Sequence, residues 1–131
     1  MRPVRVYYED TDAGGVVYYA NYLKFMERAR TEWLRALGFE QTALMLVHNV
    51  VFVVRSIAID YLRPAHFNDE IEVTVEPRLA RGSLIEIAQT IRRGTQVLVN
   101  AEVRLACVNT RSFKPVRIPK IILQALAMRD A

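Results

Sequence analysis

The sequence contains a single cysteine, Cys107, and only two histidines, His48 and His66, in 131 residues. One cysteine cannot form a disulfide within the chain, and two distant histidines with one cysteine do not make a zinc site. We therefore expect neither a disulfide within the chain nor a bound metal. Cys107 lies in a strand pattern, where a small buried side chain is a commoner role than a nucleophile. Both histidines lie in predicted loops, where we expect exposed or capping roles rather than catalysis.

Long apolar runs are also missing. No apolar stretch reaches the ~18 residues typical of a membrane-spanning helix, and the opening MRPVRVYYED lacks the apolar core of a secretory signal. These absences predict a cytoplasmic protein with no membrane span. The net charge is +4, which fits a nucleic acid, an anionic membrane or a phosphate-bearing ligand as partner. Because no run of five basic residues occurs, nucleic-acid binding is disfavoured.

The overall composition of the chain is typical of a folded domain. The chain is 52% hydrophobic and 24% charged, which fits one domain spanning residues 1–131. Between residues 19 and 37, apolar side chains recur at steps of three and four, which predicts a long amphipathic helix ended by Gly38. Shorter helices are predicted at 40–46 and 121–128. Apolar alternation or short apolar runs predict strands at 4–8, 50–62, 70–76, 84–92 and 97–107.

These elements predict an α+β fold. The turn signals at 81–83 and 93–95 separate the later strands, and such short connections force antiparallel neighbours. Pro77 is expected to interrupt the strand before it, and the apolar run at 50–54 is expected to be covered on both faces. Only one long helix is available to cover the sheet, so we expect it to lie across one face. The uncovered face carries outward acids and some apolar residues, and we expect part of it to meet a second subunit.

The stretch 8–22, YEDTDAGGVVYYANY, organises the chain. It places two acids, Asp10 and Asp12, before the long helix, and they are followed by Gly14 and Gly15, which permit a tight turn and the close approach of a ligand. The helix start then points its N–H groups back toward the acids. A carboxylate opposite such amides suits attack on a carbonyl, with a base or nucleophile on one side and oxyanion donors on the other. An aspartate that only caps the helix is the alternative.

A family resemblance covers nearly the whole chain. It rests on three motifs: EDTDAGGVVYYANYLKFMERARTEWL, FVVRSIAIDYLRPAHFNDEIEV and ARGSLIEIAQTI. With them the sequence resembles the hotdog-fold acyl-CoA thioesterases of the 4-hydroxybenzoyl-CoA thioesterase type, and within these it is most similar to the Tol–Pal-cluster acyl-CoA thioesterases. The resemblance implies a hotdog fold, in which a curved five-stranded antiparallel sheet wraps a long central helix. It also implies a homo-oligomer, either a dimer or a tetramer built as a dimer of dimers, with active sites at dimer interfaces.

The resemblance places the family's catalytic aspartate on Asp12 and its thioester-polarising backbone amide on Tyr19. Tol–Pal relatives usually carry histidine at the second position, whereas the 4-hydroxybenzoyl-CoA branch carries tyrosine. We expect Asp12 to act as nucleophile or general base, and amides near Val17, Tyr18 and Tyr19 to hold the oxyanion. Asp10 is expected to have a structural role. The residues expected to line the pocket or to pack in the core are Tyr7, Tyr8, Tyr18 and Tyr22.

The implied substrate is a thioester of coenzyme A, so no separate cofactor is expected. Arginines near the pocket mouth would bind its phosphates. The candidates are Arg55, Arg81, Arg92 and Arg93, of which Arg81 is favoured, together with Ser83, because both lie in a turn. The resemblance also makes acyl-carrier protein and the envelope-division machinery candidate partners.

Three other functions compete with this interpretation. A hydratase or dehydratase of the same fold needs a histidine base, and the sequence has none near the helix start. A non-catalytic module that binds acyl-CoA or acyl-carrier protein would not need Asp12. Nucleic-acid binding would show salt-dependent retention of DNA or RNA, which we do not expect. The sequence therefore predicts a thioesterase that acts on small acyl or aroyl thioesters.

Overall fold

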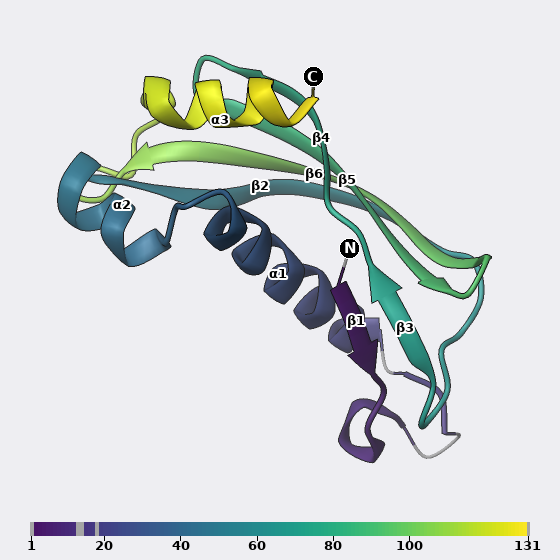
Figure 1. The fold of residues 1–131 in the computed structure, drawn as a ribbon. Coiled ribbons are helices and arrows are strands. Elements are labelled where there is room, and N and C mark those ends of the chain that lie inside the picture. The colour runs from purple at the N-terminus through teal and green to yellow at the C-terminus, as the bar shows by residue number, and fades with distance from the viewer. Residues whose placement is uncertain (1, 13–14, 18, 131) are drawn as a thin grey trace.

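The computed structural model describes residues 2–12, 15–17 and 19–130, and it shows a long helix within the curve of a bent antiparallel sheet (Figure 1). No described helix is both long and apolar enough to cross a membrane. The elements in chain order are β1 (Arg2–Arg5), a 3₁₀ turn (Tyr8–Asp10), α1 (Tyr19–Ala36), α2 (Gln41–His48), β2 (Val50–Tyr61), β3 (Glu70–Val73), β4 (Glu76–Arg81), β5 (Leu84–Arg93), β6 (Gln96–Asn109) and α3 (Lys120–Asp130). This arrangement confirms the predicted α+β hotdog fold.

The central helix, α1, forms where the sequence predicts it. It ends before Gly38, whose φ of +96° lies in the left-handed region and whose amide donates to the carbonyl of Arg35 at 2.9 Å. A glycine in this conformation is a common helix C-cap. The buried stripe faces the sheet, because Gln89 of β5 donates to the carbonyl of Met26 at 3.1 Å and accepts from Arg30 Nη1 at 2.9 Å. The buried side chains of α1 are Tyr22, Phe25, Met26, Ala29, Arg30, Trp33 and Leu34.

The sheet has the strand order β1-β3-β5-β6-β2, with β4 also paired to β5, and all pairs are antiparallel. The resemblance implied five strands, and the sheet has six because one strand position is split into β3 and β4. The split lies at Thr74, whose hydroxyl accepts the amide of Thr90 at 3.0 Å where a backbone carbonyl would otherwise accept it. A side-chain bond thus replaces one rung of the backbone ladder.

Pro77 does not interrupt its strand, so that prediction is wrong. It lies inside β4 and pairs with Ile87 of β5. β4 is hydrogen-bonded to a strand on one side only, and proline is tolerated at such an edge because its missing N–H is not needed there. β1 lies at the same edge of the sheet and carries a proline of its own, Pro3.

β2 forms the opposite edge of the sheet and contains no proline. The apolar run at 50–54 was expected to be covered on both faces, and this is wrong for Val54, which is 44% exposed. The reason is that β2 has a neighbouring strand on one side only. The sequence pattern of a buried strand therefore occurs here on an open edge.

The first strand is shorter than predicted, because β1 ends at Arg5 and the chain then enters the 3₁₀ turn. The Asp10 carboxylate accepts the amide of Tyr7 at 3.0 Å and the side-chain amide of Asn21 in α1 at 3.2 Å. These bonds confirm a structural role for Asp10, since they tie the turn to the helix. Of the tyrosines expected to line the pocket or pack in the core, Tyr7 and Tyr8 are exposed and Tyr22 is buried.

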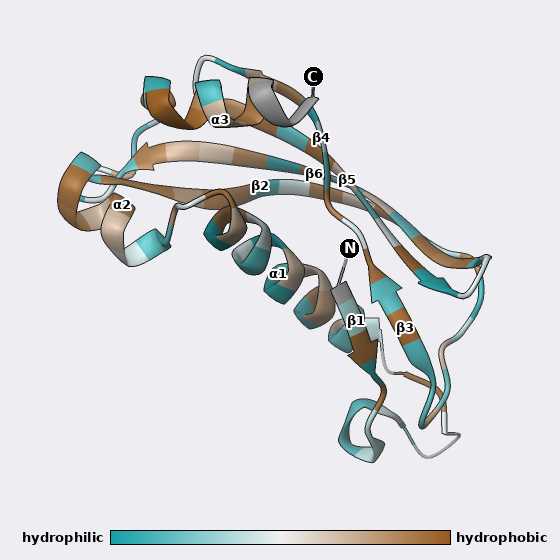
Figure 2. Cartoon of the chain, in the orientation of Figure 1, coloured by the Kyte–Doolittle hydropathy of each residue, from teal (hydrophilic) through white to brown (hydrophobic). Residues whose placement is uncertain are grey.

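The buried side chains form two clusters between α1 and the sheet. One contains Tyr22 and Phe25 at the N-terminal part of α1, and the other contains Trp33, together with residues of α3. Cys107 is fully buried in the second cluster, as predicted. Hydrophobic and hydrophilic bands alternate along β3, whose apolar residues are buried (Figure 2).

Candidate active site

The segment that carries Asp12 folds into a tight loop between the 3₁₀ turn and α1. Thr11 and Val17 form an antiparallel bridge across the loop. Inside it, the Asp12 amide donates to the Val16 carbonyl at 2.9 Å, and the Gly15 amide donates to the Asp12 carbonyl at 3.0 Å. Gly15 has a φ of +78°, a conformation that glycine adopts without strain. The loop therefore holds its own shape through backbone hydrogen bonds.

A second segment, the turn between β2 and β3, fixes the loop from outside. Val16 and His66 form an antiparallel bridge. The Val17 amide donates to the Ala65 carbonyl at 2.9 Å, and the Phe67 amide donates to the Gly15 carbonyl at 3.0 Å. These bonds make the loop and the turn a short two-stranded ladder.

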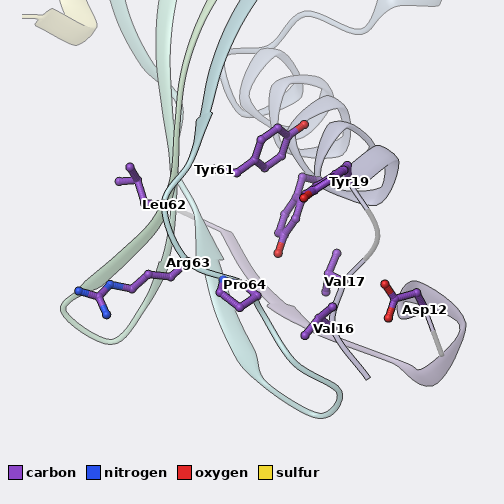
Figure 3. Close-up of a pocket in the computed structure, with 9 residues that line it drawn as sticks. Asp12, Val16, Val17, Tyr19, Tyr61, Leu62, Arg63 and Pro64 are labelled. Carbon is purple, nitrogen blue, oxygen red and sulfur yellow. The ribbon is translucent and has the colours of Figure 1, made fainter. Parts of the chain in front are cut away.

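A cavity of about 380 Å³ opens between this ladder, the start of α1 and the end of β2. Figure 3 shows the Asp12 carboxylate pointing from its loop toward the side of the cavity where Val17 and Tyr19 lie. The Arg63 side chain extends away from Asp12 at the opposite side (Figure 3). The lining residues are Asp12, Val16, Val17, Tyr19, Tyr22, Tyr61, Leu62, Arg63 and Pro64.

Three tyrosines form an aromatic wall of the cavity. The ring centroids of Tyr19 and Tyr61 are 4.9 Å apart, and those of Tyr22 and Tyr61 are 5.6 Å apart. The Tyr22 hydroxyl accepts the amide of Ala65 at 2.9 Å, and burial raises the pKa of this phenol above its usual value. Tyr22 is therefore a neutral, fixed part of the wall, whereas Tyr19 is 66% exposed at its edge.

The structure brings together the central residues of the predicted site. Asp12, Val17, Tyr19 and Tyr22 all line one cavity. Asp12 is exposed to solvent there, which a residue that meets a substrate requires. Two further predictions, the oxyanion amide of Tyr18 and the turn at Gly14, lie outside the described residues.

The predicted role of the Val17 amide is wrong. This amide already donates to the Ala65 carbonyl, so it is not directed to a bound oxyanion. The Val17 side chain is 3% exposed and still forms part of the cavity wall. The first residue of α1, Tyr19, remains as the predicted oxyanion donor within the described residues.

The structure does not bring the favoured phosphate-binding residues to this cavity. Arg81 and Ser83 lie in the β4–β5 turn beside Ala106 of β6, whereas Tyr61 at the cavity pairs with Val99 of β6. These two points of β6 are roughly 23 Å apart along the strand.

The other predicted arginines also lie outside the cavity lining. Arg55 is exposed in the middle of β2, where the pairing with β6 shifts register. Arg92 and Arg93 end β5 nearer the cavity, but neither lines it. Arg93 is paired with Asp69 at 2.7 Å.

Sequence reasoning missed four residues of the cavity wall, Tyr61, Leu62, Arg63 and Pro64. The sequence predicts Tyr61 and Leu62 as part of the strand at 50–62, and Arg63 and Pro64 as the residues that follow it. The sequence did contain a signal of a binding surface here, because the run Tyr-Leu-Arg-Pro at the end of a long apolar strand combines aromatic, apolar and cationic side chains. Its position beside Asp12 depends on the sheet topology.

Comparisons with known proteins identify the family of the chain. Residues 14–100 match the family described as the thioesterase superfamily. The chain is 49% identical over 123 residues to the acyl-CoA thioesterase YbgC of Haemophilus influenzae, which covers 94% of this chain and 90% of that protein. It is 48% identical over 122 residues to the acyl-CoA thioester hydrolase YbgC of Escherichia coli O6:H1, and this match covers 92% of this chain and 90% of that protein. The chain therefore belongs to the thioesterase superfamily and is a thioester hydrolase.

Solved structures support the same fold. A probable thioesterase from Bartonella henselae matches with a TM-score of 0.85 at 39% identity, covering 90% of this chain and 97% of that one. A 1,4-dihydroxy-2-naphthoyl-CoA thioesterase from Synechocystis matches with a TM-score of 0.89, covering 99% and 96%. The second match has 23% identity and supports the fold alone.

Proposed function

We propose that the protein hydrolyses small acyl or aroyl thioesters of coenzyme A, with Asp12 as the reacting carboxylate. The observation that carries this proposal is the position of Asp12 across an open cavity from the first residue of α1, Tyr19. The YbgC relatives, whose names describe acyl-CoA thioesterases, support coenzyme A as the leaving group. The reaction needs no cofactor besides the substrate.

In the proposed reaction, a thioester carbonyl lies between Asp12 and the start of α1. Asp12 either takes a proton from the attacking water or itself attacks the carbonyl carbon to give a mixed anhydride that water then opens. The positive end of the helix dipole and the Tyr19 amide stabilise the negative charge that develops on the carbonyl oxygen. The C–S bond breaks when the tetrahedral intermediate collapses, either to the free acid in the general-base route or to the mixed anhydride before water opens it. Coenzyme A leaves as a thiolate, since a thiol pKa of ~8.5 requires no strong general acid.

The cavity supports a short or aromatic acyl group. Its volume of about 380 Å³ and its wall of Tyr19, Tyr22 and Tyr61 fit an apolar, flat or compact group. Backbone donation does not depend on the side chain, so tyrosine at position 19 is compatible with hydrolysis. A hydratase or dehydratase is disfavoured because none of the described residues that line the cavity is a histidine.

We also propose that the enzyme works as a homo-oligomer, a dimer or a dimer of dimers, in the cytoplasm. The open edge of β2 and the exposed Val54 on it support pairing with a second copy along this strand. We also propose that acyl-carrier protein can take the place of coenzyme A as the carrier of the acyl group.

The test is a thiol-release assay across acyl-CoA lengths and benzoyl-CoA derivatives. Asp12→Asn should lower kcat by about 10²–10⁴-fold, the usual contribution of a reacting acid–base group, with an unchanged unfolding midpoint. Glu102→Gln, which changes an exposed carboxylate of β6 outside the cavity lining, is the matched control and should retain full activity.

Two outcomes would overturn parts of this proposal. Near-normal turnover of Asp12→Asn would remove Asp12 from its role. If the wild-type protein bound acyl-CoA but released thiol from none of the panel, a non-catalytic acyl-CoA-binding module would replace the enzyme.

A further inference from the structure

Asp69, in the turn between β2 and β3, forms hydrogen bonds with three other residues. Its Oδ2 accepts the amide of His66 at 2.8 Å and Arg93 Nη1 at 2.7 Å. Its own amide donates to the His66 carbonyl at 3.1 Å, and its carbonyl accepts the amide of Val6 at 2.8 Å. The Asp69 side chain therefore closes the turn on itself and fastens it to the end of β5.

Arg93 is in turn held from its other side. Its Nη2 donates to Gln96 Oε1 at 2.6 Å across the β5–β6 hairpin. The side chains of Asp69 and Arg93 are 21% and 32% exposed, so the ion pair is partly buried. Burial raises the pKa of Asp69, but the His66 amide and Arg93 outweigh it and hold this pKa below its usual value. The carboxylate is thus charged and paired at neutral pH.

Other charged groups surround the pair. His66 Nδ1 lies 3.8 Å from Asp69 Oδ2 and 3.4 Å from Arg93 Nη1. On the β1 side, Arg5 donates to the Asn68 carbonyl at 2.8 Å and pairs with Glu70 at 2.8 Å. The turn is therefore fastened to the ends of both β1 and β5.

The same turn carries the loop of Asp12. His66 bridges Val16, and the amides of Val17 and Phe67 complete the ladder between loop and turn. A displacement of the turn should therefore also displace the Asp12 backbone. The reason is that the backbone hydrogen bonds of Gly15 and Val17 connect the loop to this turn. A shift of about 1 Å in a reacting group can lower a rate by ~10²-fold.

We propose that the Asp69–Arg93 ion pair is a positioning element for Asp12, acting through the turn at 65–69 without touching the substrate. Neither side chain lines the cavity. The inference rests on the proposed function, because it assumes that Asp12 is the reacting group. Removal of an ion pair that only stabilised the fold would weaken all parts of the structure alike. Removal of the Asp69–Arg93 pair should instead displace the Asp12 loop first.

The test uses Asp69→Asn, Arg93→Gln and the double variant. Each single change should lower kcat by about 10-fold or more while KM stays within about two-fold, since the cavity wall is retained. The double variant should lose no more activity than the worse single variant, because the two residues act as one unit. Arg93→Lys keeps the charge but cannot donate to Asp69 and Gln96 in the same geometry, so its kcat should be intermediate.

Arg104→Gln is the matched control. Arg104 pairs with Glu86 at 3.2 Å across β5 and β6, in a more exposed ion pair that is not connected to the turn. Its kcat should equal that of the wild type. A loss equal to that of Arg93→Gln would overturn the proposal.

Hydrogen exchange separates positioning from general stability. In Asp69→Asn, the amides of Val17 and Phe67 should exchange faster, while amides in the middle of the β2–β6 ladder keep their protection. Uniformly faster exchange, or unchanged kcat, would overturn the proposal. If the wild-type protein released no thiol, the proposed function would fail, and exchange at these two amides would still decide whether the ion pair holds the loop.

Discussion

The hydroxyl of Tyr22 accepts a hydrogen bond from the backbone amide of Ala65 at 2.9 Å, and both residues are buried. This bond links the first turns of α1 to the turn after β2, so the helix and the turn define one wall of the cavity together. The same turn also holds the Asp12 loop through the Ala65 carbonyl, which accepts the Val17 amide. Ala65 is therefore the residue at which the helix, the turn and the loop meet.

Tyr22→Phe should destabilise the protein. The change leaves the buried amide of Ala65 without its acceptor, which typically costs about 1–3 kcal/mol. The free energy of unfolding, measured with a chemical denaturant, checks this expectation. Tyr7→Phe is the control, because Tyr7 is 62% exposed, and its effect should stay within about 0.5 kcal/mol. Equal stability of Tyr22→Phe and wild type would show that water replaces the phenol.

Arg63→Gln should raise KM for coenzyme A thioesters with little change in kcat. Arg63 is an exposed cation at the cavity edge, where it can meet a phosphate of the substrate. For such an exposed contact we expect about a 5-fold rise in KM, or about 1 kcal/mol.

Two comparisons make the Arg63 experiment specific. A pantetheine thioester, which lacks the nucleotide phosphates, should show no difference between variant and wild type. Arg78→Gln alters an exposed arginine of β4 and serves as the control for net charge. An equal KM change with both substrates would contradict a phosphate contact.

The Asp69–Arg93 pair should stabilise the fold only above a certain pH. The pKa of Asp69 is lower in the folded state than the ordinary value of 3.8, so its contribution is present above pH 3.8 and is lost as the pH falls through the lower folded value. The difference in melting temperature between wild type and Asp69→Asn should thus be present at pH 4 and shrink as the pH falls below that. A difference that grew as the pH fell below about 4 would contradict the sign of this shift.

Cys107 should resist modification in the folded protein. Burial raises the pKa of this thiol to about 11, and the side chain is 0% exposed. Since the thiolate is the reactive form, a disulfide reagent at pH 8 should label the native protein slowly and the guanidinium-unfolded protein at once. Fast labelling of the native protein would show that the second core cluster opens readily.

The sequence was sufficient for the elements whose signals are local. The three- and four-residue spacing and Gly38 predicted α1 and its end, and the run from Asp10 to Gly15 placed a carboxylate beside the helix start. The ends of strands differ from the predicted ones where a side chain takes a hydrogen bond that the backbone would otherwise make. Thr74 split a strand with its hydroxyl, and Asp10 ended the first strand early by accepting the Tyr7 amide.

The parts of the site that depend on topology were not predictable in this way. The Val17 amide was assigned to the oxyanion because its partner, the Ala65 carbonyl, is far along the chain. A turn signal at Arg81 and Ser83 shows that the chain reverses, but not at which end of the sheet. The wall formed by Tyr61 and its neighbours likewise follows from the pairing of β2 with β6.

The prolines at one margin of the sheet limit how far it can grow. Pro3 and Pro77 remove N–H groups from β1 and β4, whereas β2 has a full set of backbone donors. Another strand can therefore add efficiently only beside β2. Two copies joined there would present their proline-bearing margins outward, so that the combined sheet closes as a finite pair and does not continue into a fibre.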